Sequence, residues 1–224
     1  MSFSNTEYKF GHIDILPSFG ALMARAEFFG HELVEPIENS KQLAEDHWYR
    51  NFWLMPFQNR VGDGFYKFEE KFYNLPVNEL DKNNALHGFF SETKLNDLKW
   101  DVSDESVTIE MEFEYNGALE GYPFPFNASI HYLIDADGKL KLQYNLINTG
   151  STNMPFSAGW HPYFKLDGSR SDWKLSCGKL LHHPLNERNL PAGEPVAFEK
   201  NFDLSTDELD HCFEFVSKPY QVKL

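Results

Sequence analysis

Cysteine is scarce in this sequence, which has only Cys177 and Cys212 among its 224 residues. Two cysteines are too few for a disulfide framework, and their spacing is not that of a metal site. We expect both to be reduced residues of the core. No apolar run approaches the length of a membrane-spanning helix, and residues 1–5 lack the basic-then-apolar order of a secretion signal. These absences predict a cytoplasmic protein with no membrane partner.

Basic residues are also in the minority. The sequence has 20 Lys and Arg against 34 Asp and Glu, for a formal net charge of −14. An acidic protein is a poor partner for nucleic acids and anionic membrane surfaces, because both carry negative charge themselves. The length suits one domain with a sizeable core. We therefore expect a single domain over residues 1–224 and a ligand that is not a polyanion.

Helical periodicity is nearly absent. Only residues 40–49 are compatible with a short helix, with Ser40 as its cap and Ala44 and Trp48 four residues apart. The fold must therefore be built from strands. No glycine-rich phosphate loop occurs either.

A period of two, in contrast, is strongly marked. Apolar residues alternate with polar ones over residues 107–115 and again over 140–146, which places the apolar side chains of each segment on one face. The second segment pairs with residues 130–134 as a hairpin across Asp137-Gly138. Residues 65–68 and 71–73 predict a shorter two-stranded ribbon. The fold class is all-β, a sandwich of mostly antiparallel strands.

The most informative segment is Trp160-His161-Pro162-Tyr163-Phe164. It places a titratable imidazole between aromatic rings and beside a proline. A histidine in that setting can deliver or accept a proton in a site shielded from water, so His161 is a candidate general acid. The alternative is that His161 fills the core, with its ring nitrogens satisfied by the backbone.

Three further residues are candidates for a site. His87 precedes a glycine, Gly88, that lets the backbone bend or approach a ligand closely. Arg60 lies in an apolar stretch, so it needs a carboxylate partner or a polyhydroxy ligand, and both alternatives stay open. Asp210 sets a carboxylate among apolar neighbours, either for a ligand or as the cap of a turn.

Metal and covalent chemistry find no support in the sequence. His182 and His183 are adjacent, so their side chains point to opposite faces of a strand and cannot both ligate one metal without a bulge. Ser157 lacks the glycines of a nucleophile elbow. We expect neither a metal nor a cofactor.

Six segments, in this order, resemble those of the aldose 1-epimerases, also called galactose mutarotases. The resemblance runs from about Ile13 to Phe213, and its most specific parts contain His87 and His161. The segments are residues 59–60, 84–88, 121–126, 159–164, 190–194 and 209–213.

The resemblance implies a β-supersandwich with a cleft that binds a hexose. The family interconverts the α and β anomers of the sugar, without metal or cofactor, by opening and reclosing the pyranose ring. An acid must protonate the ring oxygen while a base removes the proton of the C1 hydroxyl. Carried over residue by residue, His161 resembles the general acid and His87 lies beside it. Arg60 and Asp210 resemble the ligands of the sugar hydroxyls.

One part of the family pattern has no counterpart. The family's general base is a glutamate downstream of the Asp210 segment, whereas this sequence stops at Leu224. The resemblance therefore implies a mutarotase-like domain that is truncated at the C-terminus and lacks its last strands. Two functions stay open, an aldose 1-epimerase and a non-catalytic carbohydrate-binding or sensing domain. A carboxylate opposite His161, Glu214 included, would distinguish them.

Overall fold

The computed structural model describes residues 4–45, 48–199, 201–207, 209–216, 218 and 221–223. Nearly all regular structure in these ranges is strand, which confirms the predicted all-β class. The strands are β1 (Ser4–Tyr8), β2 (Gly11–Leu16), β3 (Leu22–Phe28), β4 (His31–Glu32), β5 (Trp53–Leu54), β6 (Arg60–Gly62), β7 (Phe65–Phe68), β8 (Lys71–Asn74), β9 (Asn84–Leu86), β10 (Asn96–Val102), β11 (Ser106–Tyr115), β12 (Phe126–Asp135), β13 (Leu140–Asn148), β14 (Gly159–Trp160), β15 (Lys174–Leu175), β16 (Lys179–His183), β17 (Val196–Glu199), β18 (Phe202–Asp203) and β19 (Cys212–Phe215).

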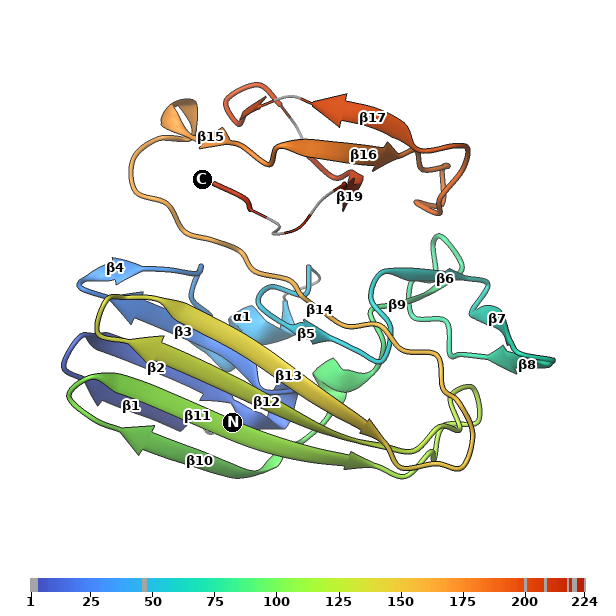
Figure 1. The fold of residues 1–224 in the computed structure, drawn as a ribbon, viewed down its shortest axis with the longest axis horizontal. Coiled ribbons are helices and arrows are strands. Elements are labelled where there is room, and N and C mark those ends of the chain that lie inside the picture. Colours follow the sequence, from blue (N-terminus) through green and yellow to red (C-terminus); the bar gives the residue numbers. More distant parts are fainter. Residues whose placement is uncertain are drawn as a thin grey trace.

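Two four-stranded antiparallel sheets form a sandwich, which with its attached short strands we call the main sandwich (residues 4–169). One sheet has the order β1-β2-β3-β4 and the other β10-β11-β12-β13 (Figure 1). Apolar side chains from both sheets meet between them, among them Ile13 and Met23 from the first sheet and Ile109 and Ile130 from the second. All four are completely buried. This core keeps the two sheets together and fixes the short strands that carry the site.

The predicted strand over residues 107–115 and the predicted hairpin are both confirmed. The alternation on β11 buries Val107, Ile109 and Met111, and β12 pairs with β13 across a turn in which Gly138 has a φ of 77°. β7 and β8 form the predicted ribbon. β13 differs in one respect, because its apolar residues are only half-buried or, in the cases of Tyr144 and Ile147, exposed. β13 is an edge strand of its sheet in the described part of the chain.

The predicted helix over residues 40–49 is wrong in its cap and in its length. The helix α1 is one turn, Ser40–Ala44, and Asn39 caps it by accepting from the backbone N–H groups of residues 41 and 42. Residues 46 and 47 of the predicted helix lie outside the described residues. Tyr49 has a φ of 54°, which a right-handed helix does not allow, because the chain there turns toward β5. Within the described ranges, three 3-10 turns complete the helical structure, at Pro17–Phe19, Phe90–Glu92 and Arg170–Asp172.

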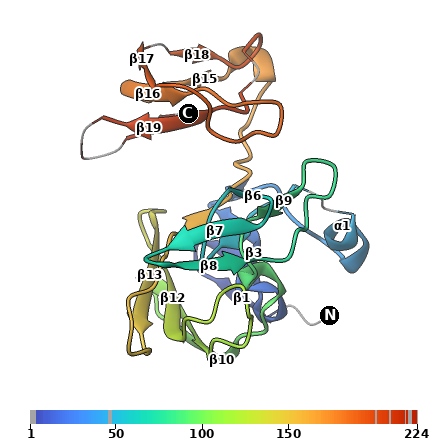
Figure 2. The same ribbon diagram turned by 90° about the vertical axis from the view of Figure 1, so that its right-hand side faces the viewer.

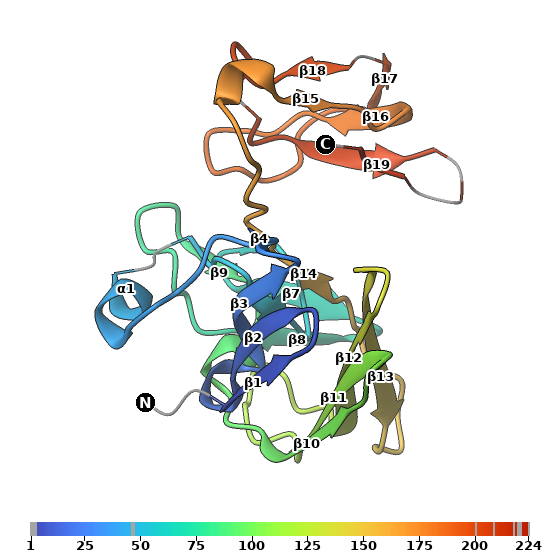
Figure 3. The same cartoon turned by 90° about the vertical axis from the view of Figure 1, so that its left-hand side faces the viewer.

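The remaining strands form a separate layer, which we call the C-terminal region (residues 170–223, as far as they are described). β16 lies between β17 and β19, and β15 pairs with β18. Figures 1, 2 and 3 show this region to one side of the main sandwich, reached by one crossing of the chain after β14. Its core is small, because Leu180 and Phe202 are the only buried hydrophobic residues among those described there.

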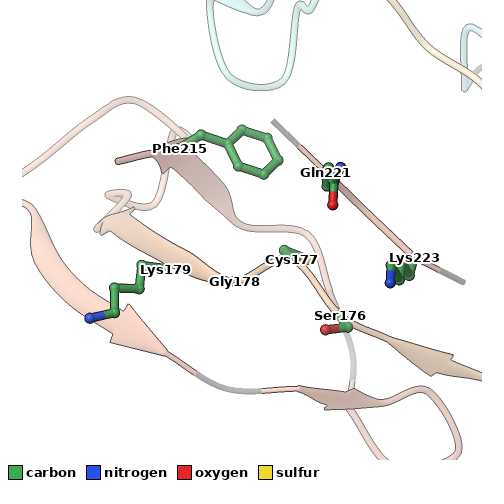
Figure 4. Close-up of a pocket in the computed structure, with 7 residues that line it drawn as sticks. All are labelled: Ser176, Cys177, Gly178, Lys179, Phe215, Gln221 and Lys223. Atoms are coloured by element: carbon green, nitrogen blue, oxygen red, sulfur yellow. The ribbon is translucent and has the colours of Figure 1, made fainter. Parts of the chain in front are cut away.

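The two cysteines lie in this region, and the expectation that they belong to the core is wrong. Both are free and both are half-buried, because the small sheet has too few apolar side chains to cover them. Cys177 borders a surface hollow of about 290 Å³ with Phe215 and Lys223 (Figure 4). Partial burial raises the pKa of the Cys177 thiol, which keeps it protonated and poorly nucleophilic. Within the described ranges, no helix has both the length and the apolar character that a membrane crossing requires.

Candidate functional site

The largest of the described cavities is a cleft of about 720 Å³ between the main sandwich and the C-terminal region. Arg60, His87 and His161 line it from the main sandwich, and Asp210 lines it from the C-terminal region. All four residues singled out from the sequence therefore border one cavity, although up to 150 residues separate them along the chain (60 to 210). The cleft has room for a small polar ligand.

His161 follows the short strand β14, which pairs with β5 and so extends from the core toward the cleft. Its backbone N–H donates to the carbonyl of Phe52 at 3.0 Å, and its carbonyl accepts from the N–H of Asn51 at 2.8 Å. The imidazole stacks on the ring of Tyr163, with centroids 5.6 Å apart and an angle of 19°. His161 is half-buried and lines the cleft, so the alternative of a core histidine is wrong.

Asn51 fixes the segment that carries His161 through hydrogen bonds of its backbone and of its side chain. Its side chain is fully buried, and its Oδ1 accepts from the N–H of Tyr163 at 2.9 Å while its Nδ2 donates to the carbonyl of Glu35 at 3.0 Å. Its backbone has a φ of 63°, which asparagine tolerates better than most residues. A buried amide with satisfied partners fixes the local backbone, because breaking those bonds would leave unpaired polar groups. Sequence reasoning missed this residue, since no local pattern marks it.

His87 enters the cleft from the end of β9, in a left-handed backbone conformation with a φ of 65°. The N–H of Asn59 donates to its Nδ1 at 3.1 Å, so the neutral ring carries its proton on Nε2. Its ring centroid lies 5.6 Å from that of His161 and 4.7 Å from that of Tyr49. Gly88 beside it packs against the residue that follows β5 so closely that a Cβ there would collide with the carbonyl of Met55. The predicted bend at this glycine is confirmed by its φ of 69°, and its close approach to a ligand stays a prediction.

Burial lowers the pKa of His87 to about 4, and the positive charges of His161 and Arg60 act in the same direction. Glu79 opposes the shift. His87 is therefore neutral near pH 7. In that state the ring can donate a hydrogen bond from Nε2 but carries no charge of its own.

Arg60 has the carboxylate partner that was one of its two alternatives. Its Nε donates to both carboxylate oxygens of Glu79, at 3.1 and 2.9 Å, and its Nη2 donates to Oε1 at 2.8 Å. The same guanidinium also lines the cleft, where it places a positive charge. The ion pair with Glu79 is confirmed, and the alternative of a ligand role for Arg60 stays a prediction. Glu79 itself was not singled out from the sequence, because a glutamate in a polar loop carries no local signal.

Asp210 lies in the loop before β19, and its side chain is exposed at the cleft. Its carboxylate makes no hydrogen bond to another described residue, so the alternative of a turn cap has no support. Glu214 does not face His161, because its carboxylate pairs with Nε2 of His183 at 3.0 Å outside the cleft. Among the described residues, the acidic groups at the cleft are Glu79, Asp81 and Asp210.

Comparison with known proteins gives one consistent result. A family model described as aldose 1-epimerase matches residues 14–224. The uncharacterized protein YihR of Escherichia coli is 26% identical over 209 residues, which cover 92% of this chain and 61% of that protein. Galactose mutarotase of Rattus norvegicus is 27% identical over 151 residues, covering 65% of this chain and 42% of that protein.

The fold is also shared with solved structures. The crystal structure of galactose 1-epimerase from Lactobacillus acidophilus matches with a TM-score of 0.80 at 16% identity, over 99% of this chain and 76% of that one. The architecture is therefore a mutarotase-like sandwich. The chain spans about three fifths of the length of YihR and less of the rat protein.

Proposed function

The chain belongs to the aldose 1-epimerase family, and from that premise we propose that it binds a hexose in the cleft and interconverts its α and β anomers. One observation carries the proposal: His161 and His87 lie with ring centroids 5.6 Å apart in a cavity that Arg60 and Asp210 also line. The two histidines can act on one atom of the sugar. The other two residues can hold its hydroxyl groups.

The proposed reaction combines two proton transfers with the reversible cleavage of one C–O bond. A base takes the proton of the C1 hydroxyl, the bond between C1 and the ring oxygen breaks, and an acid protonates that oxygen to give the open aldehyde. Rotation about the C1–C2 bond and the reverse steps then give the other anomer. The proposal assigns the acid to His161. His87, neutral with its proton on Nε2, donates a hydrogen bond to the same oxygen without competing for the proton.

Arg60 and Asp210 are proposed to orient the sugar. A guanidinium donates to hydroxyl oxygens and a carboxylate accepts from hydroxyl hydrogens, so the two together recognise a neutral polyol. The ring of Tyr163, 37% exposed beside His161, offers an apolar surface to a sugar face. We propose a small neutral hexose as the partner. The location of the protein in the cytoplasm stays a prediction.

The test is the rate of anomer exchange of fresh α-galactose and α-glucose, followed by NMR or polarimetry with and without the protein. We expect the protein to accelerate exchange and His161→Ala to reduce that acceleration by about 100-fold or more, as for loss of a general acid. Equal rates for the variant and its parent would contradict the role of His161.

The second candidate is hexose binding without turnover. It is favoured by the state of the cleft carboxylates, because Glu79 is engaged by Arg60, which lowers its pKa and makes it a weak base. Calorimetric titration with the same sugars, combined with the rate of anomer exchange, separates the two candidates. Binding without acceleration would support the second, and acceleration would exclude it.

A further inference from the structure

Glu79 is held in a single orientation. Its side chain is only 12% exposed, and both of its carboxylate oxygens accept hydrogen bonds from Arg60. A second partner, Nδ2 of Asn84, donates to Oε2 at 2.7 Å. A carboxylate with both oxygens engaged in bonds from charged and buried donors cannot rotate without breaking them.

Asn84 is the anchor of this arrangement. It is completely buried, and its second Nδ2 hydrogen donates to the carbonyl of Arg188 at 3.0 Å. Its Oδ1 accepts from Nη2 of Arg188 at 3.2 Å. Both donors and the acceptor of this amide are therefore used, and only one orientation of the side chain satisfies them. The chain of hydrogen bonds runs from Arg60 through Glu79 and Asn84 to the C-terminal region.

The consequence for Arg60 follows from its donors. A guanidinium has five N–H hydrogens. Nε and one hydrogen of Nη2 bind Glu79, and one hydrogen of Nη1 binds Oδ1 of Asn59 at 3.1 Å. One hydrogen on each of Nη1 and Nη2 is left without a partner among the described residues, on a side chain that lines the cleft.

We propose that Glu79, oriented by Asn84, is a positioning residue that fixes Arg60 so that these two N–H groups face hydroxyl oxygens of the bound hexose. The identity of the ligand rests on the proposed function. The positioning itself does not, because the hydrogen bonds that hold Glu79 and Arg60 are all made within the protein. Without Glu79, the long side chain of Arg60 would lose the partner that selects one rotamer, and binding would have to supply that ordering.

Two variants remove the charge and the reach of Glu79 in turn. Glu79→Gln keeps the shape and removes the charge, whereas Glu79→Asp keeps the charge and shortens the reach by one methylene. The matched control is Glu32→Gln, which breaks a comparable half-buried pair with Arg25, at 2.7 Å from its Nε, on β4 away from the cleft. Thermal melting of all four proteins verifies that each is folded.

Two measurements are made on each protein, calorimetric titration with galactose and glucose and the hydrogen exchange rate of the Arg60 Nε–H in a ¹⁵N NMR spectrum. We expect both Glu79 variants to raise the Kd about tenfold and to speed exchange of this N–H by a similar factor, as for loss of a charged hydrogen bond. We expect Glu32→Gln to leave both within about twofold of the parent, as for a pair with no contact to the site.

Unchanged protection of the Arg60 Nε–H in Glu79→Gln would overturn the proposal whatever the affinities are. Faster exchange with an unchanged Kd would overturn it as well, because Arg60 would then not need positioning to bind. If the parent binds neither sugar, the proposed function fails, and the exchange rate still decides whether Glu79 holds Arg60.

Discussion

The main sandwich and the C-terminal region contribute to one cleft but differ in how they are packed. Between the two sheets of the sandwich, residues such as Ile109 and Ile130 are completely buried. In the C-terminal region, Leu180 and Phe202 are the only buried hydrophobic residues among those described. Burial of apolar surface is the main source of stability, so the two regions should resist unfolding to different extents.

Because of this difference, the cleft has one well-packed side and one loosely packed side. The two histidines and Arg60 stand on the well-packed side, where β5, β9 and β14 fix their backbones. Asp210 stands on the loosely packed side. Proton transfer needs closely defined geometry, whereas a ligand for a hydroxyl group can adjust as the sugar binds. The arrangement therefore places the tighter requirement on the more rigid part of the molecule.

The contrast in packing predicts the largest effect. Ile109→Ala, between the two sheets, should lower the free energy of unfolding by about 3 kcal/mol, because it removes a fully buried side chain and leaves a cavity. Leu181→Ala removes a similar side chain from half-buried β16 and should cost about 1 kcal/mol. Urea unfolding of both variants measures the difference. Equal losses would show that the C-terminal region is packed as tightly as the sandwich.

The hydrogen bonds that connect the two regions predict the next effect. Arg188 donates to the carbonyls of Lys82 and Asn83, at 2.8 Å each, and to Oδ1 of Asp63 at 2.9 Å. Arg188→Ala should therefore release the C-terminal region, with a loss of about 2 kcal/mol or roughly 30-fold in its opening equilibrium. Hydrogen exchange of β16 relative to β11 measures it.

Arg170→Ala is the matched control for that experiment. Arg170 donates to the carbonyls of Leu204 and Asp207, so its contacts stay within the C-terminal region. It should change exchange locally, near residues 203–207, and leave the cleft face of the region protected. If both variants open β16 equally, Arg188 is not what connects the two regions.

The same contrast explains which features the sequence could predict. The strand over 107–115 and the hairpin at Gly138 were predictable, because a period of two and a turn dipeptide are local signals of a sheet with one buried face. The length of the helix at Ser40 was not. The left-handed backbone at Tyr49 prevents a helix that reaches this residue, and it stands close to buried Asn51, one of whose partners, Tyr163, lies 112 residues away.

The site shows the same limit. His161, His87, Arg60 and Asp210 could be selected because their residue types and segments match a family pattern. Glu79 could not be selected, since its role exists only through contacts with side chains on other strands. A sequence pattern marks residues that touch a ligand more readily than residues that hold them in place.

The smallest predicted effect is a pH dependence of stability, and it tests the packing on the sandwich side of the cleft. The pKa of His87 is about 4 in the folded protein against an ordinary value of 6.5, so between these values the unfolded chain binds more protons. The contribution of His87 to stability is therefore complete above pH 6.5 and declines as the pH falls toward 4. Between pH 7 and pH 5 the free energy of unfolding should fall by about 1–2 kcal/mol from this group. His87→Gln has no such titration, so its stability should depend less on pH over this range by that amount. Urea unfolding at several pH values measures both curves, and parallel curves would mean that His87 titrates normally and is not shielded by the packed side of the cleft.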